Sequence, residues 1–269
     1  MEKRGLSHLL LCLFFAAFVV FLYGPTLTIA VLSFQGPDGN LTFPMRGLSL
    51  HWFQNLFEDQ MVGDFAGSIS RTLVLAVVVM VLTVVVSLLA GMAFRKRFLG
   101  ATVLFYLTVA SLIVPSILIS LGIGLMFNVV GLQPTWWGSA LGAHLTWTLP
   151  FGVLIMFAVF NRFDRSLEEA ARDLGASPWQ GFRYVVLPLI LPSLIGVGLF
   201  GFSLSYDEFA RSSMTAGSDN TMPLEIYGMT TNVTTPVLYA LGTMTTMFSF
   251  VVIISCLALV LGMRRRRAR

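Results

Sequence analysis

The residues of this chain that could do chemistry lie in two short charged stretches between long apolar segments. The first stretch runs from residue 166 to residue 175 and contains Glu168 and Glu169. The second contains Asp207 and Glu208, close to the end of an apolar run. Carboxylates at such places can attract cations or pair with basic groups.

The motif of the commonest ATP-hydrolysing enzymes is missing. A phosphate-binding P-loop needs a lysine directly after a glycine. The two lysines of this chain, Lys3 and Lys96, follow Glu2 and Arg95 instead. The chain is therefore not expected to bind ATP by this route.

Other catalytic patterns match equally poorly. His8, His51 and His144 are too far apart for a His-Glu-x-x-His metal motif. Residues 201–205, Gly-Phe-Ser-Leu-Ser, lack the final glycine of a serine-hydrolase elbow. We therefore predict no catalytic residue, no metal site and no enzyme. We interpret His144 and Trp147, one helical turn apart, as packed between helices, with a cavity-lining role as the alternative.

The acidic pair has two interpretations. Arg211 follows Asp207 by four residues and could neutralise Asp207 and Glu208 as a helical ion pair. Alternatively, one or both carboxylates face a transport pathway and attract a cationic solute. The adjacent Tyr206 could then add a cation–π contact. The residues alone leave both interpretations open.

Composition indicates that these stretches belong to a membrane protein. The chain of 269 residues is 56% hydrophobic and only 11% charged, whereas soluble domains carry about 25% charged residues. Cys12 and Cys256 both lie inside apolar runs, so a disulfide is not expected. The net charge of +4 comes from short basic clusters between apolar runs. This placement indicates topology, and no nucleic-acid partner is predicted.

Six apolar runs have the length that a bilayer requires, about 20 residues. The first begins after a basic N-terminus but is longer than the apolar part of a signal peptide, so we interpret it as an uncleaved helix. Six helices place both termini on the same side of the membrane. The predicted helices cover residues 9–34, 72–94, 101–130, 138–160, 189–209 and 237–263.

The basic residues predict which side that is. With the N-terminus in the cytoplasm, 14 of the 17 lysines and arginines fall in cytoplasmic segments. The three exceptions are Arg46, Arg71 and Arg211. The positive-inside rule therefore places both termini and the loop 161–188 in the cytoplasm.

The loop 161–188 carries two helix-start signals. Ser166 and Glu169 have the spacing of a capping box, and Gly175 suits the left-handed position that ends a helix. Ser177 followed by Pro178 repeats the start signal. We expect two short helices joined at Gly175, either as a docking element or as an ordinary amphipathic connector.

The same loop resembles the EAA loop of ABC-importer permeases. Glu169-Ala170-Ala171-x3-Gly175 is followed, after nine residues, by Val-x-Leu-Pro at 185–188, with valine in place of the commoner isoleucine. The resemblance extends from about Thr72 to the C-terminus. It is similar to the spermidine/putrescine type, and more to the second of the two permease subunits, through residues 114–115, Gly122, Gly124, 161–163, 203–209 and 222–227.

The resemblance implies an all-α integral membrane protein with the type I importer permease fold, forming one permease domain over residues 1–269. It implies a second permease subunit, a dimer of cytoplasmic ATPases that binds ATP and Mg, and an extracytoplasmic binding protein at a bacterial inner membrane. By match, Glu169, Ala170, Ala171 and Gly175 couple the chain to the ATPase. Tyr206, Asp207 and Glu208 become substrate-pathway candidates for polyamines.

Two alternatives to a polyamine importer remain. The same importer class could carry an opine, an aminobutyrate-like compound or another organic solute. A free-standing channel or secondary carrier would need an ion-coupling site within the membrane, usually near the midplane. Asp207 and Glu208 lie instead at the edge of a predicted helix.

Overall fold

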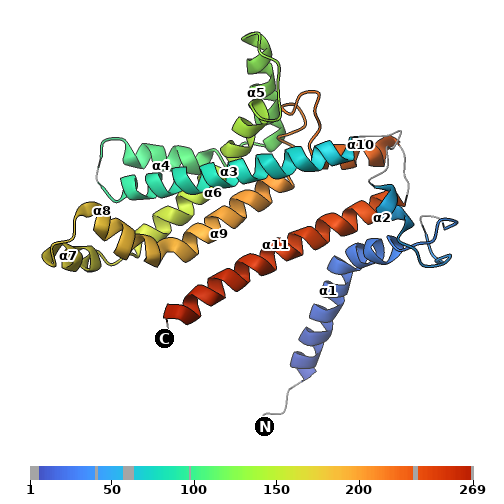
Figure 1. The fold of residues 1–269 in the computed structure, drawn as a ribbon, viewed down its shortest axis with the longest axis horizontal. Helices are drawn as coiled ribbons and strands as arrows, with labels where there is room; N and C mark the ends of the chain where they lie inside the picture. The colour runs from blue at the N-terminus through green and yellow to red at the C-terminus, as the bar shows by residue number, and fades with distance from the viewer. Residues whose placement is uncertain (1–5, 40–41, 57–63, 97, 233–235, 268–269) are drawn as a thin grey trace. The chain divides into compact units, whose positions relative to one another are not determined.

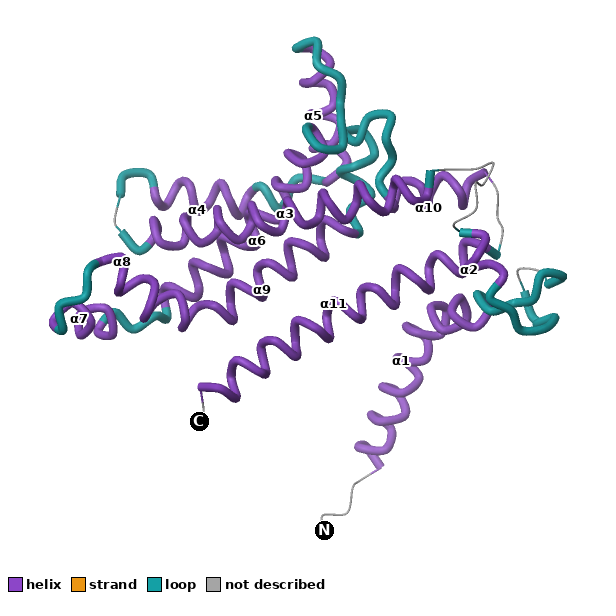
Figure 2. Tube along the Cα trace, in the orientation of Figure 1, coloured by secondary structure: helices purple, strands orange, loops and turns teal. Residues whose placement is uncertain are grey.

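A computed structural model describes residues 6–39, 42–56, 64–96, 98–232 and 236–267. Within these residues the chain is helical, and its β structure is a single isolated bridge between Gln35 and Leu48. The predicted all-α class is confirmed (Figures 1 and 2). The elements are α1 (Leu6–Leu32), α2 (His51–Asn55), α3 (Phe65–Phe94), α4 (Ala101–Ala110), α5 (Ser116–Val129), α6 (Ser139–Asn161), α7 (Ser166–Asp173), α8 (Pro178–Gly181), the π-helix η1 (Phe182–Val186), α9 (Leu187–Tyr206), α10 (Met222–Asn232) and α11 (Val237–Arg267).

Among the described residues, five helices are long and apolar enough to cross a membrane. They are Ser7–Leu32, Phe65–Phe94, Ser139–Asn161, Pro178–Tyr206 and Val237–Ala258. The basic residues Lys3, Arg4, Arg97 and Arg269, which enter the topology prediction, lie outside the described residues.

The prediction of one continuous helix over 101–130 is wrong, because the structure has two shorter helices there, α4 and α5. Proline has no backbone N–H and disfavours helical backbone in the residue before it. Pro115 itself has ψ of 132° and is the N-cap of α5. The chain between the two helices closes in tight turns, with the N–H groups of Leu112 and Ile113 bonded to Val109 and Ala110.

Helix α3 begins seven residues before its predicted start at residue 72. Asp64 caps it, because its Oδ1 accepts a hydrogen bond of 2.9 Å from the Gly67 N–H. Arg71 Nη1 also lies 3.0 Å from Asp64 Oδ2. The Gly67 hydrogen bond and then the Arg71 contact lower the pKa of Asp64. A local cap therefore extends this helix into the segment predicted to be external.

The described chain forms two compact units, and the prediction of one permease domain is not tested by this division. The first unit takes in residues 1–63 and 226–250. Its buried apolar residues come from the end of α1, the residue after α2, α10 and the start of α11: Leu32, Leu56, Met229, Val237, Ala240 and Leu241. In the loop after α1, the buried Gln35 accepts a 3.0 Å hydrogen bond from the Arg46 N–H.

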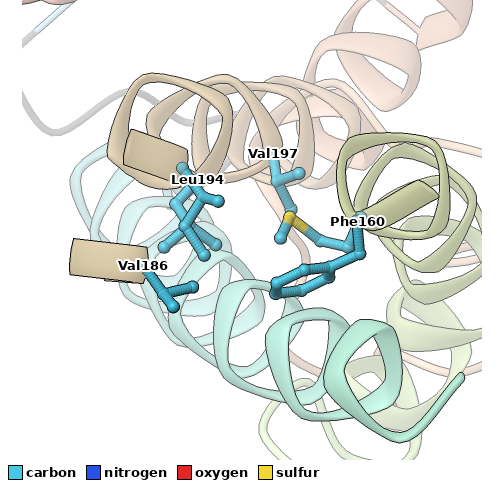
Figure 3. Close-up of a cluster of buried hydrophobic side chains, with 6 residues drawn as sticks. Phe160, Val186, Leu194 and Val197 are labelled. Carbon is cyan, nitrogen blue, oxygen red and sulfur yellow. The ribbon is translucent and has the colours of Figure 1, made fainter. Parts of the chain in front are cut away.

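The second unit takes in residues 64–225 and 251–269. Here α3, α6 and α9 pack against one another (Figure 1). Figure 3 shows Phe160, Val186, Leu194 and Val197 pointing toward one another in the buried core, which also contains Met156 and Ile190. Val84, Leu88 and Met92 of α3 pack against this cluster. Because lipid tails are as apolar as these side chains, close packing holds such helices together.

Small residues bring α3 and α6 close together. Thr83 and Ser87 are buried one turn apart on α3, facing Thr148 and Gly152 of α6. Thr83 Oγ1 donates a 2.8 Å hydrogen bond to Thr148 Oγ1. A Cβ atom added to Gly152 would lie 2.2 Å from Ser87 Oγ. The side-by-side packing of the two helices therefore depends on a glycine at position 152.

Candidate functional site

The loop between α6 and α9 contains two short helices, as predicted, and ends the first of them at Gly175. Gly175 has φ of +85°, the left-handed conformation that glycine adopts easily. The Ala176 N–H donates to Ala171 O at 3.0 Å, and the Gly175 N–H donates to Arg172 O at 2.8 Å. These two bonds form the Schellman motif that closes a helix C-terminus.

Of the two predicted helix caps, only the second is confirmed. Ser177 Oγ accepts from the Gln180 N–H at 3.3 Å, and Gln180 Oε1 accepts from the Ser177 N–H at 2.8 Å. The capping box at Ser166 is wrong, because Ser166 is already the first helical residue of α7. Asp164 Oδ1 instead accepts the Ser166 N–H at 3.0 Å. Hydrogen bonds from the Ser166 side chain and backbone lower the pKa of Asp164.

The predicted coupling residues lie on the open side of this loop. Glu169, Ala170 and Gly175 are exposed, and Ala171 is half-buried. Two large apolar side chains are also exposed beside them, Leu174 with 90% and Trp179 with 64% of its surface. Exposed apolar residues next to polar ones are typical of a protein-binding surface. We call Glu169, Ala170, Ala171, Leu174, Gly175 and Trp179 the coupling surface.

Leu174 and Trp179 were not predicted as site residues. Their sequence signal is weak, because leucine and tryptophan are unremarkable in a chain with this composition. The available signal was their position beside Gly175 and Pro178, in a loop that is otherwise mostly polar and small.

A continuous helical path joins the coupling surface to a membrane-spanning helix. Helix α8 runs directly into the π-helix η1 and then into α9. The Leu187 N–H bonds to Phe182 O, five residues earlier. Pro188 follows at once, and its ring cannot fit an α-helical carbonyl four residues before it, so a wider turn is favoured here. Val186 is buried in the core of α3, α6 and α9, which anchors this path.

A cleft of about 420 Å³ separates the loop helices α7 and α8 from the end of α3. Both basic and acidic residues line the cleft. Its basic residues are Arg95, Lys96, Arg165 and Arg172, and its acidic residues are Glu168 and Glu169. Glu168 forms an ion pair with Arg95 across it.

The second predicted region lies where α9 ends. The predicted helix 189–209 stops at Tyr206, so Asp207 is its C-cap and Glu208 lies in the following loop. Asp207 is exposed, and its carboxylate has no hydrogen-bond or ion-pair partner among the described residues. Tyr206 is half-buried, with Phe202 stacked on it at 5.8 Å between ring centroids.

Of the two acids that Arg211 could neutralise, the structure pairs it with Glu208 and not with Asp207. Arg211 is completely buried and pairs with Glu208, with Nη1 3.3 Å from Oε2. The Arg211 N–H also donates to Glu208 Oε1 at 2.9 Å. The helix has already ended, so the spacing of four residues no longer brings Asp207 and Arg211 together.

Arg211 is held by side chains from two other helices. Its Nη1 donates to Ser116 Oγ of α5 at 2.7 Å, and its Nε donates to Thr146 Oγ1 of α6 at 3.3 Å. The guanidinium carbon lies 4.5 Å from the ring centroid of Trp147. Arg211, which was assigned to an external segment, therefore fixes the loop after α9 against α5 and α6.

His144 belongs to the same buried network. Its Nδ1 lies 2.8 Å from Ser205 Oγ, and its Nε2 lies 2.9 Å from Ser212 Oγ. The interpretation of His144 as a residue packed between helices is confirmed. Together with the Arg211 contacts, this network holds the loop after α9, in which Glu208 is paired with Arg211 and Asp207 is not.

Comparison with known proteins identifies the family. The family model described as "Binding-protein-dependent transport system inner membrane component" matches residues 84–266. The spermidine/putrescine transport system permease protein PotC of Haemophilus influenzae is 31% identical over 241 residues, covering 88% of this chain and 91% of that protein. The putrescine transport system permease protein PotI of Escherichia coli is 27% identical and covers 83% of this chain and 81% of that protein.

Solved structures share the fold. A bacterial ABC transporter involved in the import of the acidic polysaccharide alginate matches with a TM-score of 0.69 and 17% identity, over 97% of this chain and 98% of that one. The MetNI methionine ABC transporter matches with a TM-score of 0.58 and 18% identity, over 74% of this chain and 95% of that one. The predicted importer permease fold is confirmed. The chain belongs to the family of binding-protein-dependent transport system inner membrane components.

Proposed function

We propose that this chain is the transmembrane permease subunit of an ATP-driven importer of polyamines or a related small amine-bearing solute. The observation that carries the proposal is the path from α8 through η1 to α9. It joins the coupling surface at one end to the open carboxylate of Asp207 at the other. One continuous helical path thus connects the proposed docking surface with a group that can attract cations.

The coupling surface is the proposed contact with a dimer of ATPase subunits. Glu169 offers a charge, Ala170 and Ala171 allow close approach, and Leu174 and Trp179 offer apolar contact area. ATP and Mg are bound by the ATPase chains, so closure around ATP displaces α7 and α8. Because α8 continues into α9, this displacement reaches the membrane-spanning part directly.

Asp207 is the proposed group of the substrate pathway. The named relatives transport spermidine and putrescine, which are cations. Partial burial raises the pKa of the Asp207 carboxyl, but at the end of a span the ionised form costs less than it would at the bilayer centre. Tyr206 beside it offers an aromatic surface for an ammonium group. Glu208 was proposed for the same role, but its pairing with the buried Arg211 favours a structural one.

The proposed topology and partners follow from the charge distribution and from the family. Both termini lie in the cytoplasm of a bacterial cell, as supported by 14 of the 17 basic residues in cytoplasmic segments. A second permease subunit completes the translocation pathway, and an extracytoplasmic binding protein delivers the solute.

The test is uptake of labelled putrescine into proteoliposomes that contain the complete complex. Glu169→Lys reverses the charge of the coupling surface, so ATP-dependent uptake should fall about tenfold or more. The variant should still insert into the membrane and purify with its partners, although less ATPase should be bound to it.

Uptake must require both the ATPase and the binding protein. Uptake without the ATPase would contradict an importer subunit and support a free-standing carrier. Uptake of an aminobutyrate-like solute in preference to putrescine would correct the substrate class alone.

A further inference from the structure

Arg95 lies at the end of α3, and its side chain contacts both the loop 161–188 and α6. It is the C-cap of α3, and its side chain is only 15% exposed. Its guanidinium forms the ion pair with Glu168 of α7, whose side chain is 20% exposed. Partial shielding from water makes such a pair stronger than one on an open surface.

The same guanidinium packs on aromatic rings at the end of α6. Its central carbon lies 5.1 Å from the ring centroid of Phe160 and 5.4 Å from that of Phe163. Both distances are within the range of cation–π attraction. Phe160 is also part of the buried core of α6 and α9. Arg95 therefore contacts α6 at a residue that is itself fixed in the core.

The backbone of Arg95 contributes a further contact. Its carbonyl oxygen accepts a hydrogen bond of 2.9 Å from Arg165 Nη2, at the start of α7. Arg95, Arg165 and Glu168 all line the cleft that separates α7 from α3. The Arg95–Glu168 ion pair spans this cleft as a side-chain strut. Without it, α7 would be tied to α3 here mainly by the Arg165 hydrogen bond.

We propose that Arg95 is a positioning residue for coupling, which transmits the displacement of α7 to α3 and α6 through Glu168. This route is separate from the covalent path through α8, η1 and α9. The inference rests on the proposed function, because it assumes that an ATPase moves α7. Two routes acting on three packed helices would move them together.

The test measures putrescine transported per ATP hydrolysed in proteoliposomes that contain the complete complex. Arg95→Gln and Glu168→Gln each remove one charge of the strut, so the ratio should fall about fivefold or more. Stimulated ATP hydrolysis should continue, since the coupling surface is unchanged. The double variant should be no worse than either single variant, because residues that act as a pair are not additive.

Lys96→Gln is the matched control. Lys96 has the same charge and lies next to Arg95 in the same cleft, but its ammonium group has no partner among the described residues. This control should keep the wild-type ratio. Arg95→Lys, which keeps the charge, should recover most of the lost coupling.

The outcomes separate this inference from the proposed function. A wild-type ratio in both Gln variants, together with reduced uptake in Glu169→Lys, would overturn the role of Arg95 alone. Wild-type uptake in Glu169→Lys as well would overturn the coupling surface itself. If the Gln variants do not assemble, Glu168→Asp tests the strut by shortening one side chain without removing its charge. A wild-type ratio in that variant would equally overturn the inference.

Discussion

At the scale of single residues, two adjacent carboxylates have opposite environments. Glu208 is bonded to both the backbone and the side chain of the buried Arg211. Asp207 is exposed and has no such partner among the described residues. A buried guanidinium needs a counter-charge, because an unpaired charge in a low-dielectric interior is costly. The position of Arg211 therefore decides which of the two acids remains available to a solute.

This difference predicts separate effects for two isosteric substitutions. Asp207→Asn should raise the KM for putrescine uptake about fivefold, the worth of one exposed ionic contact, and leave thermal stability unchanged. Glu208→Gln should lower stability by about 3 kcal/mol, because Arg211 then loses its counter-charge. Uptake kinetics and the apparent Tm of the purified complex measure the two effects. Equal loss of stability in both variants would contradict the division of roles.

The sequence indicated that Arg211 could neutralise Asp207 and Glu208 but did not decide which acid it pairs with. The spacing of four residues would bring Asp207 beside Arg211 only if the helix continued to residue 209. The helix ends at Tyr206 instead, and the loop that follows is held by Ser116 and Thr146 from distant parts of the chain. Contacts of such large sequence separation have no local signal in one sequence.

At the scale of elements, helix ends and breaks decide where the functional groups lie. Local signals predicted several of them correctly, including Gly175 and the cap at Ser177. The break at Pro115 was underestimated, because apolar composition continues across it and hides the end of α4. The π-helix before Pro188 was not predicted, since proline can also simply kink or start an α-helix. Its course depends on Val186 being buried between α3, α6 and α9.

The contact of α3 with α6 predicts a compensating pair of substitutions. Gly152→Ala places a Cβ atom 2.2 Å from Ser87 Oγ, so it should destabilise the protein by about 1–3 kcal/mol through overpacking. Adding Ser87→Gly removes the clashing atoms and should restore much of that loss. The apparent Tm of both variants in detergent checks this. Failure of the second substitution to recover any stability would show that the helices do not meet at these positions.

At the scale of the whole molecule, the apolar runs and the basic clusters carry most of the information. Five of the six predicted runs correspond to helices long enough to span a bilayer. The remaining run, 101–130, is divided between α4 and α5. Length and hydropathy are sufficient for this because a membrane forces each spanning segment to satisfy its own backbone hydrogen bonds. The side chains that join the helices, such as Arg95 and Arg211, depend on three-dimensional packing.

The proposed topology predicts opposite labelling of two surface positions. Single cysteines are introduced by Leu174→Cys in the coupling surface and Gln133→Cys in the turn after α5, in a background with Cys12→Ser and Cys256→Ser. Both positions are exposed. A membrane-impermeant maleimide should label position 174 only in inverted vesicles and position 133 only in right-side-out vesicles, because the positive-inside rule places the loop 161–188 in the cytoplasm. Labelling of position 174 from outside would reverse the topology and remove the coupling surface from the reach of any cytoplasmic ATPase.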